Sequence, residues 1–191
     1  DFSNKNTGFN GNDYVGKFRI NTNAAAKIFQ SLTLKAQLSE ESSNETYLGL
    51  TDADFDSNPY RRYLGSEADN IDTKHEQIML THLLIPSDNF TLTTKAYNNT
   101  FSRNWYKLDN VRINGTNYAL SDILEDPITN QIGYDAITGT TDSPDNALRV
   151  KANNRSYGSK GIQTVANLKF ASEKFKHDLD FGVRYHEDYE D

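Results

Sequence analysis

Side chains that alternate between apolar and polar at every second position constrain the fold of this chain more than any other feature. In residues 28–39 (IFQSLTLKAQLS), one set of alternate positions reads Ile, Gln, Leu, Leu, Ala, Leu and the other reads Phe, Ser, Thr, Lys, Gln, Ser. A period of two indicates a β-strand, whose successive side chains point to opposite faces. The alternation recurs at residues 14–21, 161–170 and 179–185, and two less regular runs, at residues 75–85 and 90–101, complete six expected strands.

The connections between the expected strands alternate between short and long. Short turns are expected at residues 21–27, 86–89 and 171–175, whereas long loops cover about residues 43–72 and 104–158. Short turns on one rim and long loops on the other are typical of an outer-membrane barrel. The chain is therefore predicted to be all-β, an antiparallel up-and-down section of a transmembrane β-barrel. A soluble all-β ligand-binding module stays an alternative, because one solvated face gives the same alternation and residues 75–85 lack a clean polar face.

Composition narrows the classes of partner. Only 36% of the 191 residues are hydrophobic and the mean hydropathy is -0.76, but 12% are aromatic, which is too many for a disordered acidic chain. A membrane-spanning strand hides its apolar residues in alternate positions, so low mean hydropathy does not oppose a barrel. No window of 18 apolar residues indicates a spanning helix. The net charge of -7 excludes nucleic acid, whose phosphates need a basic face.

No residue pattern indicates an enzyme, a cofactor or a protein-bound metal. The absence of cysteine excludes disulfides, thiolate zinc sites and cysteine nucleophiles. The four histidines lack metal-ligand spacing, and neither a G-x-S-x-G nucleophile motif nor a glycine-rich phosphate loop is present. We therefore expect no catalytic residue, with an outer-membrane enzyme or a passive porin kept as further alternatives.

Five segments resemble the barrel region of TonB-dependent outer-membrane receptors, especially those similar to ferric-dicitrate receptors. They are YVGKFRINTN, SNETYLGLTDADFDSNPYRRY, NTFSRNWYKLDN, RSYGSKGIQT and FGVRYHEDYED. The resemblance runs in the same order from about Gly8 to Asp191 and so covers nearly the whole chain. Its most specific part is the pair NETYLGLTDADF and NPYRRY.

The resemblance implies a barrel of about 22 strands, plugged by an N-terminal domain, that imports a ferric chelate with energy passed on by TonB. Six strands cannot close such a barrel and leave open edges. We therefore expect residues 1–191 to be an internal barrel section of a longer parent protein, without the plug domain. The implied location is the bacterial outer membrane. The implied partners are ferric citrate or a siderophore, membrane lipid, and the TonB complex through the parent's plug.

The stretch TDADFDSNPYRRY falls in the first long loop. Counted from Asp52, the EF-hand positions that need Gly and Glu hold Ser57 and Tyr63, so an EF-hand is excluded. An irregular calcium site on the three aspartates stays open. A solvated acidic turn that ends at Asn58 and the following proline is the expected structure.

Candidate ligand-binding side chains are basic or aromatic and lie in or beside the long loops. They are Tyr60, Arg61, Arg62, Tyr63, Arg103, Trp105 and Arg155, with Tyr134 as a weaker candidate. Guanidinium groups bind carboxylates bidentately, as an anionic ferric citrate complex requires, and tyrosines add hydroxyl donors. The alternatives are that Arg61 and Arg62 pair with acids of their own loop, and that Trp105 is an interfacial anchor of an aromatic belt.

Overall fold

The computed structural model describes residues 6–191, which divide into two compact units. The loop unit holds the described part of Asp1–Gly11 together with Glu41–Thr73 and Arg103–Asn154. The strand unit holds Asn12–Glu40, Lys74–Ser102 and Arg155–Asp191. Four of the long strands contribute residues to both units, so each unit is described by itself.

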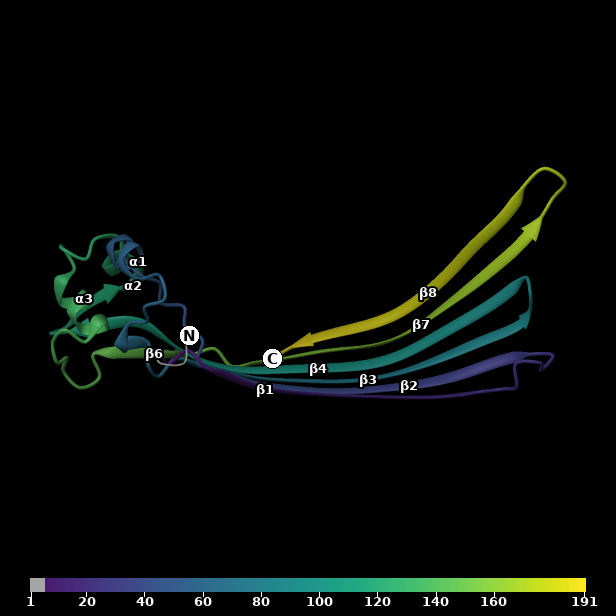
Figure 1. Cartoon of the computed structure of the whole chain (residues 1–191), viewed down its shortest axis with the longest axis horizontal. Coiled ribbons are helices and arrows are strands. Elements are labelled where there is room, and N and C mark those ends of the chain that lie inside the picture. The colour runs from purple at the N-terminus through teal and green to yellow at the C-terminus, as the bar shows by residue number, and fades with distance from the viewer. Residues whose placement is uncertain (1–5) are drawn as a thin grey trace. The chain divides into compact units, whose positions relative to one another are not determined.

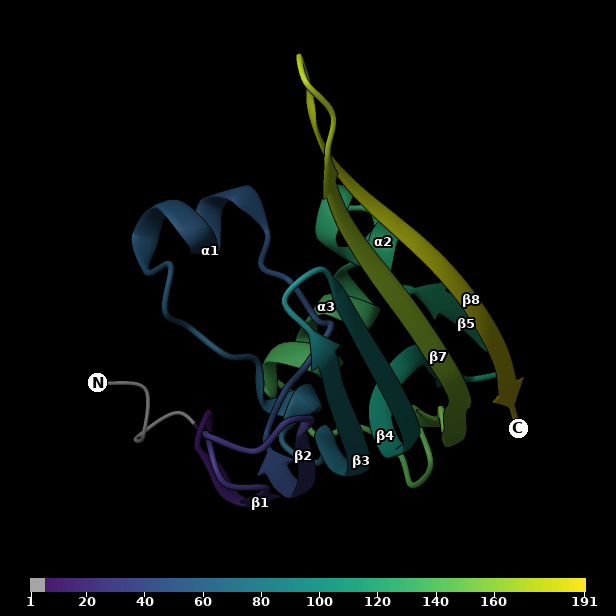
Figure 2. The same cartoon turned by 90° about the vertical axis from the view of Figure 1, so that its right-hand side faces the viewer.

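Six long strands follow one another along the sheet (Figure 1). They are β1 (Phe9–Asn21), β2 (Phe29–Ser43), β3 (Asn70–Ser87), β4 (Phe90–Ile113), β7 (Arg155–Ala171) and β8 (Lys176–Glu190), and they lie side by side in this order. The sheet is open, with β1 and β8 at its two edges (Figure 2). The pairing of β7 with β8 is antiparallel from Tyr157 opposite Glu190 to Ala171 opposite Lys176. The prediction of an all-β fold with six long strands is therefore confirmed.

Three tight connections lie at the same end of the strand unit (Figure 1). They are residues 22–28, 88–89 and 172–175. The turn expected at residues 86–89 is shorter than predicted, because Pro86 lies within β3. Proline is tolerated there because it stands next to the last residue of the strand, where a missing N–H removes little of the ladder.

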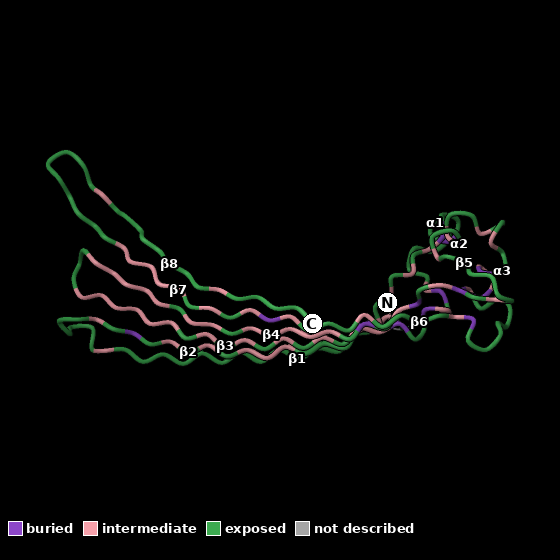
Figure 3. The backbone as a smooth tube through the Cα atoms, turned by 180° about the vertical axis from the view of Figure 1, so that it is seen from behind, coloured by how far each residue is buried: buried purple, intermediate pink, exposed green. Residues whose placement is uncertain are grey.

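The strand unit buries no hydrophobic side chain. All of its residues are described, and only Ser31 and Gly158 among them are buried. Figure 3 shows β1 and β8 as exposed along almost their whole length. A soluble domain is stabilised mainly by buried apolar surface, which this sheet does not have on either face.

The two faces of the strand unit differ in chemistry and in exposure. We define the polar face as the one that carries Ser31, Lys35, Gln77, Asn99, Ser159, Arg184, His186 and Asp188, and the apolar face as the one that carries Leu32, Leu34, Ile78, Leu80, Ile162, Leu168, Phe181, Val183 and Tyr185. Along β2 and β3 the side chains of the apolar face are the more exposed: Leu34 is 40% and Ile78 is 51% exposed, whereas Ser31 on the polar face is 4% exposed and Gln77 is half-buried. This reverses the usual order, in which the apolar side is the shielded one. On the edge strand β8 both faces are largely exposed.

The loop unit, in contrast, has a hydrophobic core. The core residues are Tyr63, Leu108, Val111, Ile123, Ala136 and Ile137. Leu108 and Val111 come from β4, Ile123 from α2 (Leu120–Glu125), and Ala136 and Ile137 from α3 (Gln131–Thr138). Tyr63 directly precedes η2 (Leu64–Ser66). The other short elements of the two loops are α1 (Asp52–Ser57), β5 (Thr116–Ala119) and β6 (Leu148–Ala152). Strands β5 and β6 both pair with β4. None of the described helices has the length and apolarity that crossing a bilayer requires.

Turn chemistry explains two of these short elements. Asn114 and Gly115 connect β4 to β5 with φ of 52° and 83°, the conformation that an Asn-Gly hairpin turn adopts. Helix α3 ends at Gly139, whose φ is 72°, because a residue without Cβ enters the left-handed region freely. Helix α2 consists of LSDILE, and it ends two residues before Pro127, because the residue before a proline disfavours helical backbone.

Candidate functional site

Asp54 is the centre of a hydrogen-bonded cluster in the loop unit. Its Oδ1 accepts from Arg61 Nη1 at 2.5 Å, and its Oδ2 accepts from the hydroxyls of Tyr63 at 2.5 Å and Tyr134 at 2.6 Å. The Thr51 side chain caps α1 by accepting from the Asp54 backbone N–H at 3.2 Å. The cluster therefore joins the first loop to α3 of the second loop.

The predicted solvated acidic turn is wrong for this stretch. Residues 52–57 form α1, and Asp54 is only 9% exposed, while Asn58 ends the helix as expected. On a helix, Asp52 and Asp56 lie one turn apart on one side and Asp54 on the other. The three carboxylates therefore do not converge, as the open calcium alternative required. The residue pattern T-x-x-D, typical of a helix N-terminus, was the signal for the helix.

Opposing influences set the pKa values of the cluster. Burial acts to raise the pKa of Asp54, but hydrogen bonds from Tyr134 and Tyr63 and the charge of Arg61 together outweigh it, so the pKa lies below its usual value. The hydrogen bond to Asp54, followed by burial, raises the pKa of Tyr134 to about 12. Burial and then the same carboxylate raise the pKa of Tyr63. The charged carboxylate is thus stabilised by neutral phenols.

Arg62 binds main-chain oxygens. Its guanidinium donates to the carbonyls of Asn6, Asn44 and Ser66, and to that of Asp69 at 3.2 Å. Burial, which outweighs the neighbouring acids, lowers its pKa. A guanidinium that satisfies several carbonyls at once holds the loop backbone together, so Arg62 has a structural role whatever else it binds.

Asp69 is the second buried carboxylate of the loop unit, with 1% exposure. Its Oδ2 accepts from the Thr46 hydroxyl at 2.6 Å and its Oδ1 from the Leu108 N–H at 2.7 Å. Burial raises its pKa, although these hydrogen bonds and the charges of Arg62 and Lys107 oppose the shift. Asp69 therefore fixes the end of the first loop to β4.

Trp105 lies in an aromatic and cationic cluster. Its ring stacks on Tyr47 at 4.4 Å between centroids, Lys107 Nζ lies 3.7 Å from the Tyr47 centroid, and the Arg103 guanidinium lies 5.8 Å from the indole. Trp105 is 6% exposed, so its prediction as an interfacial anchor is wrong. Its Nε1 is buried without a hydrogen-bond partner among the described residues.

Polar side chains form regular rows across the polar face of the strand unit. Lys35 Nζ donates to Gln77 Oε1 at 3.2 Å, Gln77 Nε2 to Asn99 Oδ1 at 2.8 Å, and Asn99 Nδ2 to Ser159 Oγ at 3.1 Å. Asp188 stands opposite Ser159 in the β7–β8 register. Side chains from five strands thus form one polar row. The alternation in the sequence predicts that these side chains share a face, but it cannot predict which of them pair.

A second row crosses β7 at Gly161. Tyr97 on β4 bonds to His186 Nδ1 on β8 at 2.6 Å and accepts from Arg184 Nε at 3.1 Å. His186 Nε2 lies 2.8 Å from Asp188 Oδ1. A Cβ at Gly161 would lie 2.6 Å from the Tyr97 hydroxyl and 2.6 Å from the Tyr185 carbonyl, so the row depends on glycine at this position.

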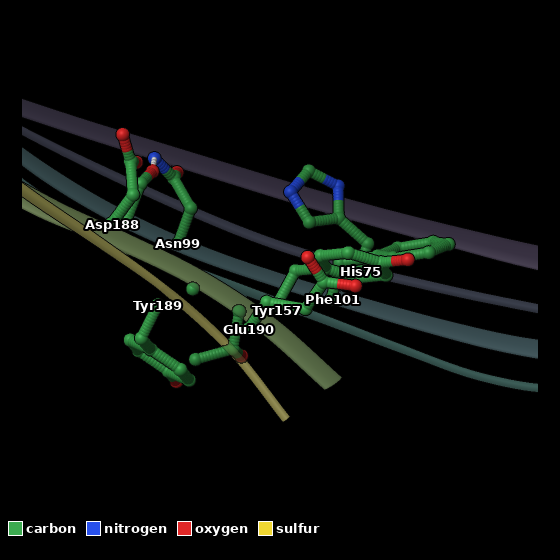
Figure 4. A pocket seen from close by; sticks show the side chains of 10 residues that line it. His75, Asn99, Phe101, Tyr157, Asp188, Tyr189 and Glu190 are labelled. Carbon is green, nitrogen blue, oxygen red and sulfur yellow. Dashed lines mark hydrogen bonds between the residues drawn. The ribbon is translucent and has the colours of Figure 1, made fainter. Parts of the chain in front are cut away.

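A pocket opens where these rows meet a row of aromatic rings (Figure 4). Figure 4 shows His75, Phe101 and Tyr157 grouped together and Asp188 beside Asn99. The pocket has a volume of about 520 Å³ and is lined only by residues of the strand unit. Sequence reasoning missed it, because its residues come from four strands.

The predicted ligand-binding residues are distributed over both units. Tyr60, Arg61, Arg62, Tyr63, Arg103 and Trp105 belong to the loop unit, and Arg155 belongs to the strand unit, where it pairs with Glu190. The structure brings Arg61 to Tyr63, with the guanidinium 5.4 Å from the ring, and Arg103 to Trp105. Tyr63 is buried, whereas Tyr60 is exposed. Ligand binding by these residues stays a prediction.

The pairing of Arg61 with Asp54 agrees with the alternative that this arginine binds an acid of its own loop. Its side chain is still 40% exposed. No protein-family model and no curated protein matches the chain.

Proposed function

We propose that this chain is a section of the transmembrane β-barrel of an outer-membrane transporter. The transporter binds an anionic ferric chelate, ferric citrate or a siderophore, and imports it with energy transmitted by TonB. The observation that carries the proposal is the exposed apolar face of the strand unit, whose side chains no part of that unit covers. In a bilayer, lipid covers such a face, and the polar face lines the lumen.

The length of the apolar face fits a membrane. On β7 the face runs through Ile162, Thr164, Ala166, Leu168 and Phe170. Eight steps of about 3.3 Å give roughly 26 Å, which compares with the apolar band of about 25 Å on outer-membrane barrels. On β8, Tyr185 stands opposite Ile162 and Leu179 opposite Leu168, so the band continues onto the next strand.

Charged pairs lie at the border of this apolar band, at the end of the strands away from the tight turns. Lys74 and Glu76 pair at 2.9 Å, and Lys160 and Glu187 pair at 2.9 Å. Lys74 and Glu76 stand an even number of residues from Ile78, and Lys160 stands two residues from Ile162. Glu187 is opposite Lys160 in the β7–β8 register, so both pairs lie on the apolar face. Ion pairs that begin where the apolar residues stop are expected at the border between lipid and water.

The polar face and the loop unit support passage and capture of a polar ligand. A lumen must be lined by polar groups, which the rows through Gln77 and Tyr97 provide. A folded loop unit with its own core holds the exposed part of Arg61 in a fixed place, and a guanidinium suits an anionic chelate. The choice of a ferric chelate and of TonB rests on the segments that resemble ferric-dicitrate receptors.

The test is uptake of iron-55, supplied as ferric citrate, by cells that carry the full-length protein, with and without TonB. We expect uptake that requires TonB and that falls about tenfold in Arg61→Ala, the loss of one charge-assisted hydrogen bond. Arg149→Ala, an exposed arginine on β6, is the matched control. Arg62→Ala is avoided because it would release four carbonyls.

TonB-dependent uptake that survives Arg61→Ala would remove that arginine from the ligand site and keep the transporter. Membrane insertion without uptake would keep the barrel and reject ferric citrate. A protein that is absent from the outer membrane would reject the proposal in favour of a soluble module.

A further inference from the structure

The pocket on the polar face of the strand unit has a floor of aromatic rings. His75 and Phe101 lie 6.4 Å apart at an interplanar angle of 66°, and Phe101 and Tyr157 lie 6.1 Å apart at 35°. The three residues come from the neighbouring strands β3, β4 and β7. Aromatic rings attract cations to their faces, because the ring quadrupole is negative there.

Two carboxylates of β8 complete the pocket. Glu190 stands opposite Tyr157 and Asp188 opposite Ser159, so both face the aromatic floor and the amide of Asn99. None of the ten lining residues is a lysine or an arginine. The formal charge of the lining is therefore negative.

The two carboxylates differ in what they already bind. Glu190 pairs with Arg155, so a guanidinium is held at this edge of the aromatic floor by the fold itself. Asp188 has one oxygen on His186 Nε2, while its side chain is 70% exposed. The His186 bond fixes the orientation of Asp188 and leaves its Oδ2 to meet a ligand.

We propose that this pocket binds an organic cation, a planar amidinium or guanidinium group or a primary ammonium. The cation lies against the rings of Phe101 and Tyr157 and donates hydrogen bonds to Asp188. A carboxylate and ring faces together stabilise such a group better than either alone. The site goes beyond the proposed transport of an anionic chelate, which these carboxylates would repel.

The test compares benzamidine, a planar cation, with benzamide, its neutral counterpart of nearly the same shape. Binding of each is measured by isothermal titration calorimetry to the full-length protein in detergent at low salt. We expect saturable binding of benzamidine, and binding of benzamide at least about tenfold weaker, since benzamide lacks the charge-assisted hydrogen bond. Benzoate is expected to bind weakest.

Two variants and one control assign the binding to the pocket. Asp188→Asn keeps the size and removes the charge, and Tyr157→Leu removes a ring; each is expected to weaken benzamidine at least about tenfold. Asp180→Asn removes a carboxylate from the same face of the same strand but outside the pocket and is expected to leave binding unchanged.

Equal affinity for benzamidine and benzamide, or no loss in Asp188→Asn, would overturn the proposal. If Tyr157→Leu fails to fold, the result for Asp188→Asn alone still tests the proposal. Iron uptake plays no part in the readout, so failure of the proposed transport function leaves this test intact.

Discussion

At the scale of single residues, the two buried aspartates of the loop unit have different chemical roles. Asp54 receives a cation and two phenols and has a lowered pKa, whereas Asp69 receives a hydroxyl and a backbone N–H and has a pKa that burial raises. An ionised carboxylate is thus well satisfied at Asp54 and less so at Asp69. Stability of the loop unit at neutral pH therefore depends more on the charge of Asp54.

The substitution Asp54→Asn should destabilise the loop unit at pH 7 by about 1 to 3 kcal/mol. Asparagine has one oxygen, so it cannot accept both from Arg61 and from the two tyrosines. Asp56→Asn, on the exposed side of α1, should change stability by less than about 0.5 kcal/mol. Trp105 is the chain's single tryptophan and is buried in this unit, so its fluorescence during urea unfolding reports the difference.

In Asp54→Asn, the free energy of unfolding should depend less on pH than in the unsubstituted protein, both at acidic and at alkaline pH. Because the pKa of Asp54 is lowered in the folded state, its contribution is full above its ordinary value of 3.8 and is lost as the pH falls below it. Because the pKa of Tyr134 is raised from 10.0 to about 12, its contribution is full below pH 10 and is lost as the pH rises toward 12. If the free energy of unfolding of Asp54→Asn depended on pH in the same way as that of the unsubstituted protein, these roles of Asp54 and Tyr134 would be contradicted.

From the sequence, candidate site residues could be chosen by their chemical type, but their contacts could not be predicted. Arg61 and Arg62 were singled out by their charge, but the contact with Asp54 lies seven residues away and the Arg62 contacts reach as far as Asn6. Tyr134, a weak candidate, proved to be bonded to Asp54 across 80 residues. No local pattern encodes such pairings, because they form only when segments of the loop unit pack together.

At the scale of elements, residue pattern predicted long strands well and short elements poorly. The six strands were found because 13 to 24 residues give the alternation many repeats. Strands β5 and β6 have four and five residues and α1 has six, too few for a period to be visible. Helix α3 was missed although Gly139 marks its end, because its buried residues pack on tertiary neighbours.

Glycines in the strands allow a test of the row that crosses β7. Gly161→Ala should destabilise the strand unit by about 1 to 3 kcal/mol, since its Cβ would meet a backbone carbonyl and the Tyr97 hydroxyl. Gly16→Ala, on β1, has nothing within 4 Å of the added Cβ and should be neutral or slightly stabilising. The measurement is urea unfolding of the full-length protein followed by circular dichroism, and equal effects of the two variants would reject the role of Gly161.

At the scale of the whole molecule, the chain combines a unit that has a core with a sheet that has none. The loop unit buries hydrophobic side chains from both loops, so its folding follows the usual physics of small domains. The strand unit exposes its apolar face, so its stability must come from whatever covers that face. Lipid and water differ in how they accept charge: lipid excludes charged side chains according to depth, whereas water solvates them.

Two neighbouring substitutions on β7 distinguish a lipid-covered face from a solvated one. Ala166 lies in the middle of the apolar face opposite Phe181, and Val165 lies on the polar face opposite Gly182. If lipid covers the apolar face, Ala166→Arg should destabilise the folded protein by about 2 to 4 kcal/mol, the range for arginine at mid-membrane depth. Val165→Arg points to the polar face and should be clearly milder, although it loses the packing of Val165 over Gly182.

The measurement is the folded fraction of the full-length protein after refolding into phosphatidylcholine vesicles, at increasing urea, for the parent and both variants. A larger loss for Ala166→Arg than for Val165→Arg supports burial of the apolar face in lipid. If water covered that face, arginine would be solvated at residue 166, and the order of the two variants would reverse, because Val165→Arg alone loses the packing of Val165 over Gly182. The ranking of two adjacent residues therefore decides the environment of the whole sheet, since one step along a strand exchanges its faces.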